Sequence, residues 1–255
     1  MGTRTSYAPG TFSWADLATT DADAAKAFYS ALFGWKYDDQ PIGDGSVYSM
    51  ARRDGADVAA LSVASDQPPH WNCYVSVASV EESATKAGEL GATLMAEPFD
   101  VMDSGRMAVI GDPAGAALCL WEARDHPGAG LVNTPGAMTW NDLVTPDADG
   151  AASFYGALFG WTTEEVPEAG GYRTIRNGDR MNGGIMPMPP EQQGQTPPNW
   201  MPYFGHDDVV GLTESIGDHG GRLYNGPMHM PQGSIAIFGD PQGAVFAAWT
   251  GQYED

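Results

Sequence analysis

The chain contains one stretch twice, and this internal repeat limits the folds that are open to it. Residues 14–35 begin with Trp-Ala-Asp-Leu and end with Leu-Phe-Gly-Trp, and a closely similar stretch returns without a gap as residues 140–161. Two further motifs occur once in each half, Pro-Pro-x-Trp at 68–71 and 197–200 and Gly-Asp-Pro-x-Gly at 111–115 and 239–243. A duplication of this extent predicts two similar domains in tandem.

The length of 255 residues suits two domains, each with a core of its own. The end of the first copy is placed by the Gly- and Pro-rich stretch from His126 to Gly130, and the turn Pro135-Gly136 matches Pro9-Gly10 ahead of the first copy. We therefore expect four parts: an unstructured N-terminal lead-in over 1–11, a first domain over 12–123, a linker over 124–136 and a second domain over 137–251.

Each copy is predicted to contain the order strand, helix, strands two times. In the first copy, Phe12–Thr19 has a strand-like pattern, and residues 21–33 have apolar side chains at helical spacing. Either Asp21 or Thr20 caps the start of this helix, and Gly34 stops it. A second helix is predicted over 80–90, again followed by short strands, so a fainter duplication lies within each copy.

Acidic side chains outnumber basic ones by 33 to 12, and the formal net charge is -21. Such a field repels phosphate backbones and anionic lipids, which excludes nucleic acid and membrane surfaces as partners. The sequence has neither the ~20-residue apolar run of a membrane span nor a secretory leader, so we expect a cytoplasmic protein. Cys73 and Cys119 predict neither a disulfide framework nor a zinc site.

The combination of these motifs resembles the glyoxalase, bleomycin-resistance and extradiol-dioxygenase superfamily, also called vicinal oxygen chelate proteins. The resemblance rests on a strand followed by Asp-x6-Phe-Tyr, on the helix end Leu-Phe-Gly-Trp and on Gly-Asp-Pro-x-Gly, and it extends from Phe12 to Trp249. The tandem arrangement is similar to two-domain actinobacterial proteins described as glyoxalase-like or hydroxylase. The resemblance implies an α+β fold of two tandem domains, each a pair of βαβββ units forming a cupped mixed sheet with helices outside and the ligand in the cup.

Enzymes of this superfamily hold a divalent metal in the cup, and the resemblance implies where its ligands would lie. These positions are occupied by Trp14, Asn72 and Cys119 in the first copy and by Trp140, Met201 and Ala247 in the second. Indole, thioether and methyl groups are not ligands for a hard divalent ion. We therefore expect no metal in either cup and no other cofactor, which puts in question the metal-assisted activities that the resemblance implies.

Side chains two apart on a strand share a face, which predicts what lines each cup. Both sets place two indoles and a phenol around one carboxylate: Trp14, Asp16, Asn72, Tyr74, Cys119 and Trp121 in the first copy, and Trp140, Asp142, Met201, Tyr203, Ala247 and Trp249 in the second. Such walls suit a flat, mostly apolar ligand. For the rings, the alternative is that they fill the sheet as ordinary core. For each carboxylate, two interpretations stay open: it is tied to neighbouring donors, or it is kept for a ligand or a proton transfer.

Two other groups of side chains give weaker signals. Tyr48 and Tyr172 occupy equivalent positions and are expected either at the mouth of the cup or on the strand surface. The five histidines lack counterparts in the other copy and metal-ligand spacing, so we interpret them as solvated or core residues.

The leading hypothesis is metal-independent binding of a small hydrophobic, aromatic molecule, in resistance, sequestration or support of natural-product metabolism. The alternative is an enzyme, either a metal-dependent lyase, isomerase, dioxygenase or hydroxylase or a cofactor-free enzyme that uses Asp16 or Asp142 as general base. A third hypothesis is an interaction module whose cups are filled by its own side chains. For the assembly, the sequence is compatible with a monomer of pseudo-twofold domains or with a homodimer.

Overall fold

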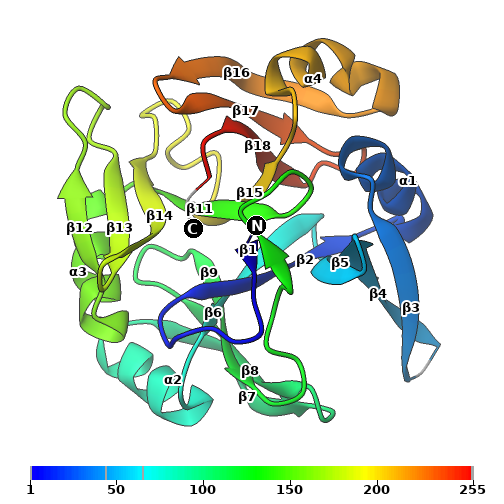
Figure 1. The fold of residues 1–255 in the computed structure, drawn as a ribbon. Coiled ribbons are helices and arrows are strands. Elements are labelled where there is room, and N and C mark those ends of the chain that lie inside the picture. The colour runs from blue at the N-terminus through cyan, green and yellow to red at the C-terminus, as the bar shows by residue number, and fades with distance from the viewer. Residues whose placement is uncertain (1, 44, 65, 254–255) are drawn as a thin grey trace.

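The computed structural model describes residues 2–43, 45–64 and 66–253, which form two curled mixed sheets with helices on the outside (Figure 1). The first copy supplies an eight-stranded sheet in the order β3-β4-β5-β2-β6-β9-β8-β7. Its elements are β2 (Phe12–Thr19), α1 (Ala22–Phe33), β3 (Lys36–Gly43), β4 (Ser46–Arg53), β5 (Ala56–Val63), β6 (His70–Ser76), α2 (Val80–Glu89), β7 (Thr93–Val101), β8 (Gly105–Gly111) and β9 (Ala117–Ala123).

The second copy repeats this order as β12-β13-β14-β11-β15-β18-β17-β16, and two short strands join the same sheet. Its elements are β11 (Met138–Thr145), α3 (Ala148–Phe159), β12 (Thr162–Glu165), β13 (Arg173–Asn177), β14 (Arg180–Pro187), β15 (Asn199–Gly205), α4 (Val209–Ser215), the 3-10 turn η1 (Ile216–His219), β16 (Arg222–Met230), β17 (Gly233–Gly239) and β18 (Val245–Gly251). The added strands are β1 (Gly2–Thr3) and β10 (Leu131–Val132). The predicted fold of tandem paired βαβββ units is confirmed.

The helices begin and end where the sequence signals lie. Asp21 and Asp147 cap the N-termini of α1 and α3, and their carboxylates accept the backbone N–H of the residue three positions on. Gly34 and Gly160 end the same helices in the left-handed conformation, with φ of 68° and 77°. A residue without a side chain adopts this conformation most readily, so the Leu-Phe-Gly-Trp motif stops both helices at the same point.

The strand register brings the predicted cup residues onto one face. In the first sheet, Trp14 lies opposite Tyr74 and Asp16 opposite Asn72. Tyr74 in turn lies beside Cys119 in the parallel pair of β6 and β9. The second sheet repeats the pattern, so in each sheet these predicted residues share one face.

The N-terminal lead-in differs from the prediction, because it is ordered rather than unstructured. Gly2 of β1 pairs with Val132 of β10, which lies within the predicted linker. The Tyr7 hydroxyl donates to the carbonyl of Ala129 at 2.6 Å. Two-residue strands are too short to show periodicity, and their pairing depends on a segment more than a hundred residues away, so the sequence pattern gave no sign of them.

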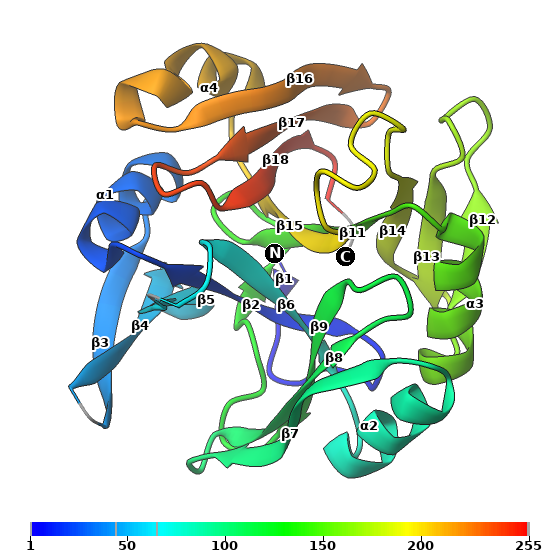
Figure 2. The same ribbon diagram turned by 180° about the vertical axis from the view of Figure 1, so that it is seen from behind.

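The two copies contact each other through the duplicated motifs. Trp71 Nε1 donates to the Tyr29 hydroxyl at 3.0 Å, and this hydroxyl donates to Asp240 Oδ2 of the other copy at 3.1 Å. The second copy makes the same Trp–Tyr–Asp contact in the opposite direction, through Trp200, Tyr155 and Asp112. Figures 1 and 2 accordingly show α1 beside the loop between β17 and β18, and α3 beside α2.

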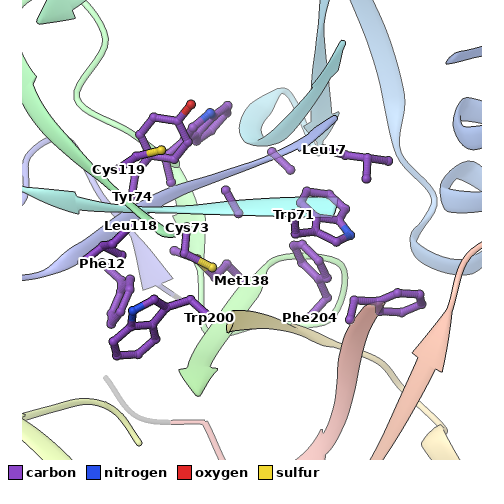
Figure 3. Close-up of a cluster of buried hydrophobic side chains, with 14 of the residues drawn as sticks. Phe12, Leu17, Trp71, Cys73, Tyr74, Leu118, Cys119, Met138, Trp200 and Phe204 are labelled. Atoms are coloured by element: carbon purple, nitrogen blue, oxygen red, sulfur yellow. The ribbon is translucent and has the colours of Figure 1, made fainter. Parts of the chain in front are cut away.

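The main hydrophobic core contains residues of both copies, and aromatic rings make contacts between them. Phe12 and Trp200 lie 4.9 Å apart between ring centroids, as do Trp71 and Phe204 (Figure 3). Each pair joins one copy to the other, so the tandem domains share a core. Within the described residues, no helix has the length and apolar character needed to cross a membrane.

Candidate functional site

Asp16 is the centre of a hydrogen-bonded network in the first cup. Its Oδ2 atom accepts from the hydroxyls of Tyr74 and Tyr48 at 2.7 and 2.9 Å, and its Oδ1 atom accepts from Asn72 Nδ2 at 2.8 Å. Trp14 Nε1 donates to the Tyr48 hydroxyl at 3.0 Å. The strands β2, β4 and β6 therefore converge on one carboxylate, which is only 7% exposed.

Asp142 has the corresponding place in the second cup and is 2% exposed. Its Oδ1 atom accepts from Trp140 Nε1 at 2.8 Å and from the Tyr172 hydroxyl at 2.9 Å, and its Oδ2 atom accepts from the Tyr203 hydroxyl at 2.6 Å. Trp140 Nε1 also lies 3.1 Å from the Tyr172 hydroxyl. All three donors are aromatic side chains, so this carboxylate is held by the walls of the cup.

Burial and hydrogen bonding change the pKa values of the two buried carboxylates in opposite directions. Burial raises the pKa of both Asp16 and Asp142, and the three donors around each carboxylate lower it and offset part of that effect. Burial also raises the pKa of Tyr74 and Tyr203 well above the usual value, with the nearby carboxylate adding to the rise. The phenols therefore stay protonated and act as donors, which satisfies the buried carboxylates.

The two cups differ in how far they are closed. In the first, the ring of His126 packs edge-on against Trp14, with 4.6 Å between the ring centroids, and its centroid lies 6.1 Å from that of Trp121. Both indoles are almost fully buried. In the second, Trp140 and Trp249 are only partly buried. They pack around a small apolar cluster that is separate from the main core and consists of Met201, Tyr203, Ile235 and Ala247, with Met228, Ile237 and Val245 at its edge.

The side chains at the positions that the resemblance implies for metal ligands do not fit a divalent ion. The Trp14 indole can only donate and is already bonded to Tyr48. Cys119 offers a single soft thiol, which a hard divalent ion does not favour. Met201 and Ala247 supply a thioether and a methyl group. Across residues 2–43, 45–64 and 66–253, no group of three or more His, Cys, Asp or Glu side chains could hold a metal.

The structure decides between the two positions that the sequence left open for Tyr48 and Tyr172, and it adds a histidine that the sequence did not single out. Tyr48 and Tyr172 are part of the carboxylate networks, and their equivalent positions in the two copies were the signal that could have placed them there. His126 closes the first cup, although nothing in its sequence context distinguishes it from a surface histidine. The strand register places the remaining residues predicted for each cup on the same face of their sheet as Asp16 or Asp142, and their role in ligand binding stays a prediction.

Two curled sheets, each built from paired βαβββ units with aromatic side chains around a buried carboxylate, define a tandem protein of the glyoxalase type. Residues 14–121 match the family described as "Glyoxalase-like domain", and residues 136–247 match the family described as "Glyoxalase/Bleomycin resistance protein/Dioxygenase superfamily". The chain belongs to this superfamily.

Relatives with curated names extend over nearly the whole chain. The Mycobacterium tuberculosis protein named "Putative glyoxylase CFP32" is 42% identical over 97% of each chain. The Streptomyces peucetius "Anthracycline biosynthesis protein DnrV" is 29% identical over 95% of this chain and 94% of its own.

Solved structures with the same fold include a Mn(II)-bound glyoxalase and a 2,3-dioxygenase. The Mn(II)-bound glyoxalase from Novosphingobium aromaticivorans has a TM-score of 0.67 at 17% identity, covering 95% of this chain and 82% of its own. The 2,3-dioxygenase LapB from Pseudomonas sp. KL28 has a TM-score of 0.68 at 14% identity, covering 97% of this chain and 94% of its own. At these identities the likeness shows the shared fold and nothing of the reaction.

Proposed function

We propose that the second cup binds a flat, mostly apolar aromatic molecule without a metal, and that this binding serves natural-product metabolism. The observation that carries the proposal is the arrangement of Trp140 and Trp249. The Trp140 indole is fixed by hydrogen bonds to Asp142 and Tyr172, and the Trp249 indole by a bond to the carbonyl of Gln252, yet both rings keep part of their surface exposed. Rings held in this way offer preorganised stacking surfaces.

The chemistry of the cup favours binding over general-base catalysis. Both oxygens of Asp142 already accept hydrogen bonds, and the hydroxyl of Tyr203 is committed to this carboxylate. A general base must reach the proton that it removes, and Asp142 would first have to release one of its donors. Apolar side chains such as Met228 and Ile237 surround the rings, which suits a ligand that contributes surface rather than hydrogen bonds.

The setting is suggested by the relatives. Two Streptomyces proteins that are 29% identical to this chain are named for anthracycline biosynthesis, and an anthracycline carries a planar fused-ring system. A planar polycyclic compound is the kind of ligand that two indoles and a flexible methionine accommodate. Aromatic polyketides or compounds of similar shape are therefore the ligand class that we propose.

The test is isothermal titration calorimetry with an uncharged hydroxyanthraquinone. We expect one site per chain, because the first cup is closed by His126. Trp249→Ala should weaken binding about tenfold or more, since the ring's buried area and stacking are lost. Trp249→Phe retains a ring and should keep most of the affinity. Equal affinity in the wild type and Trp249→Ala, or two equivalent sites per chain, would show that the ligand does not bind as proposed.

A further inference from the structure

A cavity of about 570 Å³ lies at the start of β11, between the N-terminal lead-in and the turn that joins β13 to β14. Three arginines line it, Arg4 from the lead-in and Arg176 and Arg180 from the hairpin, and Asp179 is the one acidic side chain among its lining residues. Its remaining wall is partly apolar and includes Phe12, Met138 and Trp140. The cavity thus combines a positive side with an aromatic side.

The positive charge of this cavity stands out in so acidic a chain. Only 12 basic side chains face 33 acidic ones, and three of the 12 meet here. Six other basic side chains form ion pairs, but Arg4, Arg176 and Arg180 form none with any carboxylate in the described part of the chain. Salt screens distant charges beyond ~8 Å at physiological ionic strength, so these nearby guanidinium groups govern what binds in the cavity.

Comparison of the two copies shows why Arg176 is unpaired. Its counterpart in the first copy is Arg52, which lies opposite Asp57 in the β4–β5 hairpin and forms an ion pair with it at 2.7 Å. In the β13–β14 hairpin the residue opposite Arg176 is Met181. Arg176 instead donates to the carbonyl of Asp179 at 3.1 Å, which holds its side chain at the turn and leaves its charge without a carboxylate.

The same comparison explains why there is a cavity at all. In the first copy the linker crosses this place: Ala129 N donates to the Ser13 carbonyl and Gly130 N to the Asp57 carbonyl, each at 2.8 Å. By the strand register, the counterparts of Ser13 and Asp57 are Thr139 and Met181, and both of these line the cavity. The cavity is therefore the space that the linker occupies in the first copy.

We propose that this cavity binds a small organic acid as its carboxylate, with the acid's apolar body against the aromatic wall. A planar guanidinium matches a carboxylate through two parallel hydrogen bonds, and arginines from two separate segments can hold it from both sides. The cavity volume lies in the range of small-molecule sites. This site and the binding of an uncharged aromatic molecule in the cup are independent proposals, although Trp140 borders both.

The experiment uses isothermal titration calorimetry of the full chain with 2-naphthoate and with 2-naphthamide, its uncharged counterpart. The wild type should bind naphthoate more tightly than the amide, and added salt should weaken only the naphthoate. Arg176→Gln should reduce naphthoate affinity about tenfold, the loss expected for one charged hydrogen bond. Met181→Asp should have a similar effect, because it restores the carboxylate that pairs with the equivalent arginine of the first copy.

The matched control is Arg222→Gln, which removes an exposed arginine on β16 at the opposite edge of the same sheet. This variant should bind naphthoate as the wild type does. The proposal is overturned if the amide binds as tightly as the acid in Trp249→Ala, which lacks the stacking surface proposed for the cup, or if both Arg176→Gln and Met181→Asp leave naphthoate affinity unchanged. Because Arg176→Gln is a polar change at a partly exposed position of β13, a folding defect in Met181→Asp alone would still leave the proposal testable.

Discussion

Asp142 and Asp16 illustrate how a carboxylate is retained in a wall of aromatic rings. Each is almost fully buried, and each accepts three hydrogen bonds from neutral side chains. Removing an ionised group from water is costly, and hydrogen bonds to the charged form offset only part of that cost. The buried carboxylate also orders its surroundings, because one acceptor fixes the orientation of tyrosines or a tryptophan that come from different strands.

The difference in folding stability between the wild type and Asp142→Asn should depend on pH, because the charged form of Asp142 is costly to bury. Burial raises the pKa of Asp142 above its ordinary value of 3.8, so the unfolded chain loses this proton at lower pH than the folded chain does. The contribution of Asp142 to folding is therefore full below that value and is lost as the pH rises through the raised pKa. In urea denaturation from about pH 4 to about pH 8, the stability advantage of the wild type over Asp142→Asn should shrink.

Asp16→Asn is the matched variant in the first copy and should follow the same trend, because burial raises the pKa of Asp16 as well. An advantage that stays constant or grows with pH would show that the charge of the carboxylate is not the costly element.

The linker is the element that makes the two cups unequal. It leaves β9, places His126 against Trp14, and then crosses the starts of β2 and β5 through the backbone bonds of Ala129 and Gly130. It ends in β10, which pairs with the N-terminal β1. A single connecting segment thus closes the first cup, orders the N-terminal lead-in and leaves the equivalent space in the second copy as a cavity.

His126→Phe should change how stability depends on pH. Burial lowers the pKa of His126 below its ordinary value of 6.5, so the unfolded chain takes up a proton that the folded chain resists. The folded state therefore loses stability as the pH falls through about 6.5. Phenylalanine keeps the ring without the titration, so the variant should lose less stability than the wild type between about pH 8 and about pH 5.5 in thermal denaturation.

The control for this prediction is His219→Phe, since His219 is exposed at the end of η1. This variant shows what placing a phenylalanine at an exposed histidine position does by itself. A His126→Phe profile identical to the wild type would mean that the linker does not hold His126 in a buried, uncharged state.

The whole molecule is held together by contacts that run between the copies in both directions. The turn of each Gly-Asp-Pro-x-Gly motif is closed by Oδ1 of its aspartate, which accepts backbone N–H groups of the turn, and Oδ2 accepts the tyrosine hydroxyl of the other copy. Trp35 Nε1 and Trp161 Nε1 donate at 2.7 Å to the carbonyls of Gly136 and Gly10, at the start of the opposite copy. The motifs that repeat in the sequence are therefore largely the interface between its halves.

Tyr29→Phe and Tyr155→Phe should each lower the free energy of unfolding by about 1–3 kcal/mol, because each leaves a buried indole N–H and a carboxylate oxygen without their partner. The two effects should be similar in size because the contacts are related by the pseudo-twofold arrangement. Urea denaturation measures both, and Tyr224→Phe, at a tyrosine that is 52% exposed, serves as the control with little expected change. A loss in only one of the two variants would contradict the equivalence of the contacts.

The sequence by itself determined the tandem architecture, the helix boundaries and the composition of each concave face. These depend on local rules: an aspartate and a glycine bound α1, and alternation along β2 sends Trp14 and Asp16 to the same side. The motifs that resemble the glyoxalase superfamily could also be identified without a structure. The same is true of the side chains at the implied metal-ligand positions, which are poor ligands.

Only the tertiary structure decided which segments close or open these faces. Three features join residues that lie far apart in the chain. β1 pairs with β10, His126 packs against Trp14, and Arg4 and Arg176 line the same cavity. Such contacts are set by packing between elements and by the path of the linker, and neither follows from the pattern of any single stretch. The two copies have nearly the same motifs, yet the linker lies across one of them alone, and this difference separates a closed cup from one with a charged cavity beside it.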